Sequence, residues 1–121
     1  MKILLVDDSR VVKALVQEML DEKGYDMTYA QDGQVAIECV QSGEKFDFIL
    51  LDWNMPVLDG PGFLSKCNEL NLDPCPIIMM TTENSHEHFE KAISLGASEY
   101  IIKPFTPDIL FGKMEMVKGA A

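Results

Sequence analysis

The chain is poor in cysteine, and its few cysteines are not arranged in pairs. Cys39, Cys67 and Cys75 make an odd number, and none belongs to a CxxC motif. This pattern argues against a disulfide framework and against a redox role, and reduced thiols are typical of the cytoplasm. We expect Cys39 and Cys67 to pack as small apolar residues, and Cys75, between two prolines, to be partly exposed.

Positive charge is also scarce, because ten Lys and Arg residues face twenty Asp and Glu residues and the net charge is −10. A negative field of this size repels phosphate backbones and anionic lipid, which disfavours direct nucleic-acid binding and membrane adsorption. It suits a protein that meets basic partners or binds divalent cations. No apolar run approaches membrane-spanning length, and Met1–Val6 reaches acidic residues too early for a signal peptide. We therefore predict a cytoplasmic protein.

What the sequence does contain is a regular alternation of short apolar runs and amphipathic segments. Helix-start residues follow each run, and glycines at 24, 43 and 96 are typical of helix ends. This alternation predicts an α/β fold in which parallel strands are joined by right-handed crossovers, with helices on both faces of one sheet. The predicted strands are 3–6, 27–30, 48–51, 77–80 and 100–102, and the predicted helices start after Ser9, Asp32, Asp59, Ser85 and Thr106. With no linker or repeat, residues 1–121 are predicted to form a single domain.

Polar residues stand directly after four of these runs, and they predict a functional site. They are Asp7 with Asp8, Asp52, Thr81 and Lys103. Parallel strands end at the same edge of a sheet, so these side chains are expected to converge. Three neighbouring carboxylates cannot all stay ionised unaided, and Mg²⁺, which prefers oxygen ligands, relieves their repulsion. The lysine supplies a fixed charge suited to a phosphoryl oxygen, and the threonine supplies a hydroxyl donor.

Each of these residues also has an ordinary structural interpretation. A single aspartate often caps a loop or favours a helix N-terminus, and one lysine can be surface charge. It is their joint arrangement that indicates a site. His86 and His88 are two positions apart on a predicted helix, so their side chains diverge and we predict that both face solvent rather than a metal.

Taken together, these motifs resemble those of the receiver domain of two-component signalling, the CheY-type response regulators, over essentially the whole chain. The resemblance rests on Val6-Asp7-Asp8-Ser9, Asp52-Trp53-Asn54-Met55-Pro56, Asp59-Gly60, Thr81, Gly96-Ala97 and Lys103-Pro104-Phe105, in that order. It implies a flavodoxin-like three-layer sandwich with a five-stranded parallel sheet of order 2-1-3-4-5 and five helices.

The resemblance also implies roles for individual residues. Asp52 would be the phosphoacceptor, and Asp8, Asp52 and the backbone carbonyl of Asn54 would bind Mg²⁺, with Asp7 acting through water. Lys103, in a cis peptide bond with Pro104, would hold the phosphoryl group. Thr81 would turn toward that group and Tyr100 would move inward. A phosphoryl group adds up to about two negative charges, which gives Thr81 and Lys103 new contacts to make.

Positions beside this site modulate its chemistry in the family. Asn54 and Glu83 stand as in chemotaxis-type members, where they affect the water that hydrolyses the acyl phosphate. Thr82 stands where the family usually carries Ala or Gly, and we expect its bulk to narrow access to Asp52.

The function implied is a phosphorylation-controlled switch that is not an enzyme. Its phosphodonor would be a histidine kinase or histidine phosphotransfer protein, and its output partner would bind the face made by the fourth helix, fifth strand and fifth helix. Two alternatives stay open, a receiver fragment of a larger multidomain regulator and an aspartate-nucleophile phosphatase, whereas a flavin-binding relative is disfavoured. The phosphatase class favours Asp rather than Asn54 at that position, and acids after the first strand repel a flavin phosphate.

Overall fold

The computed structural model describes residues 1–72 and 74–120, and it shows five strands alternating with five helices. All ten predicted elements are present. In chain order they are β1 Lys2–Val6, α1 Arg10–Glu22, β2 Asp26–Ala30, α2 Gly33–Gln41, β3 Phe48–Asp52, α3 Gly60–Glu69, β4 Ile77–Thr81, α4 His86–Ser94, β5 Glu99–Ile102 and α5 Pro107–Ala120.

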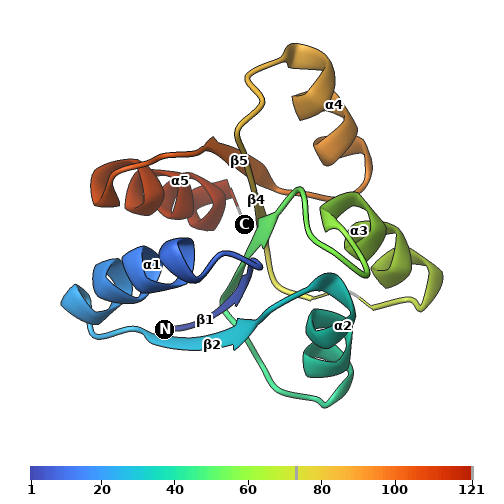
Figure 1. Cartoon of the computed structure of the whole chain (residues 1–121), viewed down its shortest axis with the longest axis horizontal. Coiled ribbons are helices and arrows are strands. Elements are labelled where there is room, and N and C mark those ends of the chain that lie inside the picture. The colour runs from blue at the N-terminus through green and yellow to red at the C-terminus, as the bar shows by residue number, and fades with distance from the viewer. Residues whose placement is uncertain (73, 121) are drawn as a thin grey trace.

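The strands form one parallel sheet in the order β2-β1-β3-β4-β5, which confirms the topology implied by the resemblance. Helices α1 and α5 cover one face of the sheet, and α2, α3 and α4 cover the other (Figure 1). The helix that joins β1 to β2 therefore lies on the opposite face from the helices that join the later strands. All five strands end at one edge, and that edge carries the polar residues singled out in the sequence.

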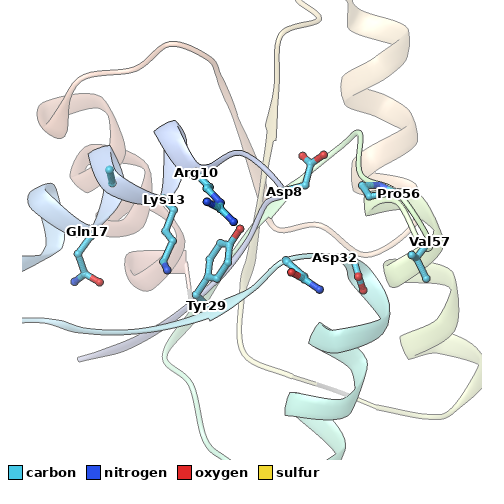
Figure 2. Close-up of a pocket in the computed structure, with 10 residues that line it drawn as sticks. Asp8, Arg10, Lys13, Gln17, Tyr29, Asp32, Pro56 and Val57 are labelled. Atoms are coloured by element: carbon cyan, nitrogen blue, oxygen red, sulfur yellow. The ribbon is translucent and has the colours of Figure 1, made fainter.

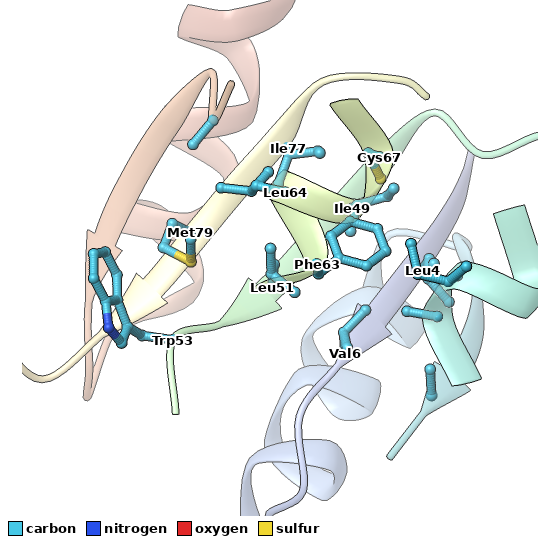
Figure 3. Packing of buried hydrophobic residues seen from close by; sticks show 14 of the residues in the cluster. Leu4, Val6, Ile49, Leu51, Trp53, Phe63, Leu64, Cys67, Ile77 and Met79 are labelled. Atoms are coloured by element: carbon cyan, nitrogen blue, oxygen red, sulfur yellow. The ribbon is translucent and has the colours of Figure 1, made fainter. Parts of the chain in front are cut away.

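Alternate side chains of each strand enter two separate hydrophobic cores. In β1, Leu4 and Val6 pack with α2 and α3, whereas Ile3 and Leu5 pack with α1 and α5. Figure 3 shows the first core, where the ring of Phe63 lies among strand residues of β1 and β3. The three central strands are buried on both faces, which explains the apolar runs 3–6, 48–51 and 77–80 within them.

The predicted helix caps are present in the structure. The side-chain oxygens of Ser9, Asp32, Asp59 and Ser85 each accept a hydrogen bond from a backbone N–H in the first turn of the helix that follows. The hydroxyl of Thr106 accepts one from Ile109 at the start of α5. These short polar side chains satisfy donors that have no partner within the helix and so define where each helix begins.

Some apolar residues of the helices lie at the surface, among them Leu15 and Leu70. Leu15 is 51% exposed, because the buried stripe of α1 is narrow and runs through Val16 and Leu20. Leu70 is 38% exposed, because α3 ends at Glu69 and Leu70 forms its C-cap. Within the residues that the structure describes, no helix combines the length and hydropathy needed to cross a membrane.

Candidate functional site: an acidic cluster at the carboxyl edge of the sheet

Asp52 is the last residue of β3 and lies almost completely buried at 6% exposure. Lys103 holds its carboxylate, with the Nζ atom 2.9 Å from Oδ1. Just beyond Asp52 the chain turns closely on itself, and the N–H of Gly60 donates to the carbonyl of Trp53 at 2.9 Å. A Cβ atom at residue 60 would lie 2.6 Å from the carbonyl oxygen of Asp52, so only glycine permits this approach.

Asp7 and Asp8 follow β1 and differ sharply in environment. Asp7 is fully buried, and its Oδ2 atom lies 3.2 Å from Lys103 Nζ while its Oδ1 accepts a hydrogen bond from the N–H of Ser9 at 2.8 Å. Asp8 is exposed at the mouth of the site. The site therefore has one carboxylate fixed by hydrogen bonds and another that is open to solvent.

These three carboxylates are close enough to share one cation. One oxygen from each of Asp7, Asp8 and Asp52 lies within 4.8 Å of the other two. In an octahedral Mg²⁺ site with bonds of about 2.1 Å, neighbouring ligands are about 3 Å apart and opposite ones about 4.2 Å apart. The three oxygens thus lie within reach of one magnesium ion, and hard carboxylate oxygens are the donors that this ion prefers.

Burial and neighbouring charges together set the pKa values of Asp52 and Lys103. Burial, opposed by Lys103 and reinforced by the charges of Asp7 and Asp8, raises the pKa of Asp52 above its ordinary value. Burial by itself would lower the pKa of Lys103, but its contacts with Asp52 and Asp7 outweigh burial and raise that pKa. Lys103 is therefore held as a cation, and its single positive charge does not balance the three carboxylates of the cluster.

Thr81 and Lys103 are brought to the same edge by neighbouring strands. Thr81 is 2% exposed at the end of β4, and its carbonyl accepts a hydrogen bond from the N–H of Lys103 at 2.8 Å. The Thr81 hydroxyl accepts a bond from the N–H of Glu83 at 3.0 Å. The peptide bond between Lys103 and Pro104 is cis, as the resemblance implies.

The remaining predicted residues lie around this centre. Asn54, Thr82 and Glu83 are exposed, with Asn54 in the loop after Asp52 and the other two in the loop after Thr81. Tyr100, on β5, is half-buried, and its ring centroid lies 4.6 Å from that of Phe89 on α4. The structure thus brings the acids and Lys103 together and leaves the modulating residues at the rim.

One histidine was wrongly predicted to face solvent. His86 is largely exposed and its Nε2 lies 2.8 Å from a carboxylate oxygen of Glu90, but His88 stacks on Trp53 with ring centroids 3.5 Å apart. The His88 Nε2 atom is buried and makes no hydrogen bond in the part of the chain described. The sequence signal for this contact was the four-residue spacing between His88 and Ala92, which places both on the inner side of α4.

Comparison with known proteins agrees with this geometry. The family model described as the response regulator receiver domain matches residues 3–115. The chain is 36% identical to chemotaxis protein CheY1 of Helicobacter pylori over 98% of both sequences. It is 35% identical to chemotaxis protein CheY-3 of Vibrio cholerae over 97% of this chain and 91% of the relative.

Solved structures show the same fold. Chemotaxis response regulator CheY4 of Vibrio cholerae superposes with a TM-score of 0.87 at 35% identity, covering 96% of this chain and 97% of the other. The receiver domain of the Francisella response regulator 1452 gives a TM-score of 0.88 at 28% identity, covering 98% and 97%. The chain therefore belongs to the response regulator receiver family, is CheY-like, and is a signalling switch rather than an enzyme.

Proposed function

We propose that Asp52 accepts a phosphoryl group from a histidine kinase or a histidine phosphotransfer protein, and that this modification switches the binding of a downstream protein in the cytoplasm. One observation carries the proposal. A nearly buried carboxylate lies 2.9 Å from a lysine and within 4.8 Å of two further carboxylates. Phosphoryl transfer depends mainly on positioning and charge neutralisation, and this arrangement supplies both.

Four residues would hold a Mg²⁺ ion for this reaction. Asp8 and Asp52 would bind it directly, Asn54 would bind through its backbone carbonyl, and buried Asp7 would act through water. When bound, the ion would neutralise the carboxylates and the phosphoryl oxygens. Asp52 attacks phosphorus as the nucleophile, and Lys103, already a cation at its side, binds a phosphoryl oxygen.

Thr81 and Tyr100 would convert the modification into a change of shape. The Thr81 hydroxyl, which accepts from the Glu83 N–H in this structure, would turn to donate to the phosphoryl group. Tyr100 would then move inward, away from its contact with Phe89. The exposed Thr82, Glu83 and Asn54 would tune access to Asp52 and hydrolysis of the acyl phosphate.

The face formed by α4, β5 and α5 would bind the output partner. Helix α4 buries only Ala92, and Ile93 is 39% exposed beside it, so apolar surface is available there. Tyr100 and Phe89 are both half-buried on this face. A movement of either ring would change the surface that a partner meets. The Helicobacter, Campylobacter and Vibrio relatives are named as chemotaxis proteins, which favours a chemotaxis-type partner.

Trp53 makes the phosphoacceptor proposal easy to test, because it is the only tryptophan and adjoins Asp52. We expect its fluorescence to change when Mg²⁺ is added and to change further when acetyl phosphate follows. Intact mass should increase by one phosphoryl group in the same sample. Asp52→Asn should abolish the second change and the mass increase.

Magnesium should also stabilise the fold by a predictable amount. A ligand that binds only the folded state adds about 2.7 kcal/mol to the free energy of unfolding when present at about 100 times its Kd. Urea unfolding of the native chain with and without Mg²⁺ measures this gain, and Asp8→Asn should remove most of it. An Asp52→Asn chain that still gains a phosphoryl group would refute the proposal.

A further inference from the structure

A wide crevice opens beside the acidic cluster. Its volume is about 840 Å³, and it lies between the start of α1, the end of β2 and the loop after β3, as Figure 2 shows. Asp8 lines this crevice and also belongs to the acidic cluster, so the two spaces adjoin. In open parallel sheets, ligands bind outside the carboxyl ends of the strands, at the point where the strand order reverses, which here lies between β1 and β3.

The α1 side of the crevice is basic, although the protein as a whole carries a net charge of −10. Arg10, the only arginine of the chain, lines it two residues after Asp8, and Lys13 lies one turn further along α1. Both side chains are exposed, and in the described part of the chain neither forms an ion pair within 4.0 Å. An unpaired guanidinium in a crevice that adjoins the acidic cluster is available to bind an anion.

The opposite wall of the crevice is held in place. The hydroxyl of Tyr29 donates to the carbonyl of Asp7 at 2.6 Å, and Lys13 Nζ lies 4.5 Å from the centre of the Tyr29 ring. Asp32 is directed into its own helix, because its Oδ1 accepts bonds from two backbone N–H groups of α2. The acids that line the crevice thus either cap a helix or belong to the acidic cluster, so no carboxylate pairs with Arg10 or Lys13 there, and Lys13 already lies over the Tyr29 ring.

We infer that Arg10 and Lys13 form a subsite for the carboxylate leaving group of an acyl phosphate. The inference rests on the proposed phosphorylation of Asp52 and assigns the class of small phosphodonor that the crevice accepts. An Asp52 oxygen forms the new bond to phosphorus while the bond from phosphorus to the donor's bridging oxygen breaks. That oxygen keeps the electron pair and leaves as part of a carboxylate, which needs no proton.

The guanidinium of Arg10 matches this leaving group in shape and charge. Its planar set of donors can bind both oxygens of a carboxylate, and negative charge grows on those oxygens as the bond breaks. Phosphoramidate provides the contrast, because its protonated nitrogen leaves as neutral ammonia. Phosphoimidazole likewise releases a neutral imidazole. Neither leaving group gains from a nearby cation, so Arg10 should distinguish the donor classes.

The test measures phosphorylation rates of the full chain by Trp53 fluorescence and intact mass, at saturating Mg²⁺, with acetyl phosphate, phosphoramidate and phosphoimidazole. Arg10→Gln should slow the reaction with acetyl phosphate by about tenfold, the effect of losing one charge-assisted contact at an exposed site. The reactions with the other two donors should keep their rates. Lys13→Gln should also slow only the reaction with acetyl phosphate, by a smaller factor.

Two further variants separate the subsite from general charge. Lys45→Gln removes one positive charge from an exposed residue that does not line the crevice, and it should leave all three rates unchanged. Arg10→Lys keeps the charge but loses the planar fork, so it should recover only part of the acetyl phosphate rate. Mg²⁺ affinity, read from Trp53, should be the same in every variant.

The outcomes separate the inference from the proposed function. An equal loss with all three donors would mean that Arg10 attracts only the phosphoryl group, and it would overturn the leaving-group subsite. Unchanged rates in Arg10→Gln would overturn it as well. If the native chain is not phosphorylated by any donor, the proposed function itself fails.

Discussion

Helices α3 and α4 lie on the same face of the sheet but are attached to it very differently. α3 buries Phe63, Leu64 and Cys67 in the core, and its first residue, Gly60, packs against the backbone of Asp52. α4 buries only Ala92. Its contacts also include two ring contacts at the rim, where His88 stacks on Trp53 and Phe89 meets Tyr100.

This difference separates two tasks within one layer. The carboxylate that we propose as phosphoacceptor needs a fixed position, and α3 supplies it through an apolar face that is costly to displace. A switching surface has to move at low cost, and an element with few buried apolar groups opens more easily. The stacked rings link α4 to the residue next to Asp52, so a change at the site has a short route to α4.

Truncation of the largest core residue of α3 should have the largest effect. Phe63 is 0% exposed, and Phe63→Ala should lower the free energy of unfolding by about 3–5 kcal/mol. Phe89→Ala on α4 removes a half-buried ring and should cost about 1 kcal/mol. Urea unfolding followed by circular dichroism measures both. If the two costs were equal, the proposed difference between the helices would be wrong.

Substitution of Gly60, which lies close to the Asp52 backbone at the start of α3, should have the second-largest effect. Gly60→Ala places a Cβ atom 2.6 Å from the Asp52 carbonyl and 3.0 Å from the Trp53 Cα. The strain should cost about 1–3 kcal/mol and should slow phosphorylation by displacing Asp52. The matched control is Gly112→Ala in α5, where an added Cβ meets nothing within 4 Å. That variant should be neutral or slightly stabilising, because alanine favours helix.

Removal of the stack at α4 should alter the environment of Trp53 with little loss of stability. Trp53 is 8% exposed under His88, so His88→Ala should shift its emission to longer wavelength and increase quenching by iodide. The free energy of unfolding should change by about 1 kcal/mol or less. His86→Ala, two residues away and exposed, should leave the spectrum as it is. A spectrum that is insensitive to both changes would show that the stack does not cover the indole in solution.

Thiol labelling compares how readily α3 and α4 open, with the smallest change to the structure. Burial raises the pKa of Cys67 to about 11, so at pH 8 only about one native thiol in a thousand is ionised. Labelling then proceeds through transient opening of α3 and should be slow. A cysteine placed at Ala92 should react faster, because α4 opens more easily. Cys39→Ser and Cys75→Ser supply the common background for both measurements.

The raised pKa of Cys67 also predicts how the free energy of unfolding depends on pH. A thiol whose pKa is raised by folding favours the folded state below its ordinary value near 9.0. That contribution is lost as the pH rises from about 9 to about 11, because only the unfolded thiol ionises readily in that range. Stability of the native chain should therefore fall above pH 9 more steeply than that of Cys67→Ala. Parallel pH curves for the two would contradict this assignment.

Most of the fold could be predicted from local patterns. The apolar runs marked the strands, and Ser9, Asp59 and Ser85 marked helix starts through hydrogen bonds that span only a few residues. Strands extend past the apolar runs to Asp52 and Thr81, because the ladder joins backbone groups and accepts polar side chains at its ends. The strand order came from the family resemblance, since the alternation of elements allows several orders.

The candidate site could likewise be predicted from the sequence only in part. Its acids and Lys103 were predictable, because the end of every parallel strand faces one edge. The crevice was not, because Arg10, Tyr29 and Val57 meet there from three distant segments and no local pattern links them. The spacing of His88 and Ala92 indicated the inner side of α4, but the stack of His88 on Trp53 was missed because no local pattern links that side to the residue after β3. Backbone geometry also played a part, since Val57 has a φ of +70° that its β-branched side chain does not suggest.

The central sheet also partitions the interior into two compartments. Neighbouring side chains such as Leu4 and Leu5 belong to different cores, and no residue is shared between the two buried sets in the part of the chain described. Substitutions without common neighbours combine additively in their free energies. Leu20 and Phe63, on opposite sides, should therefore behave as independent sites. The layer of α1 and α5 can be redesigned as one module while the layer that carries α3 and α4 is kept as it is.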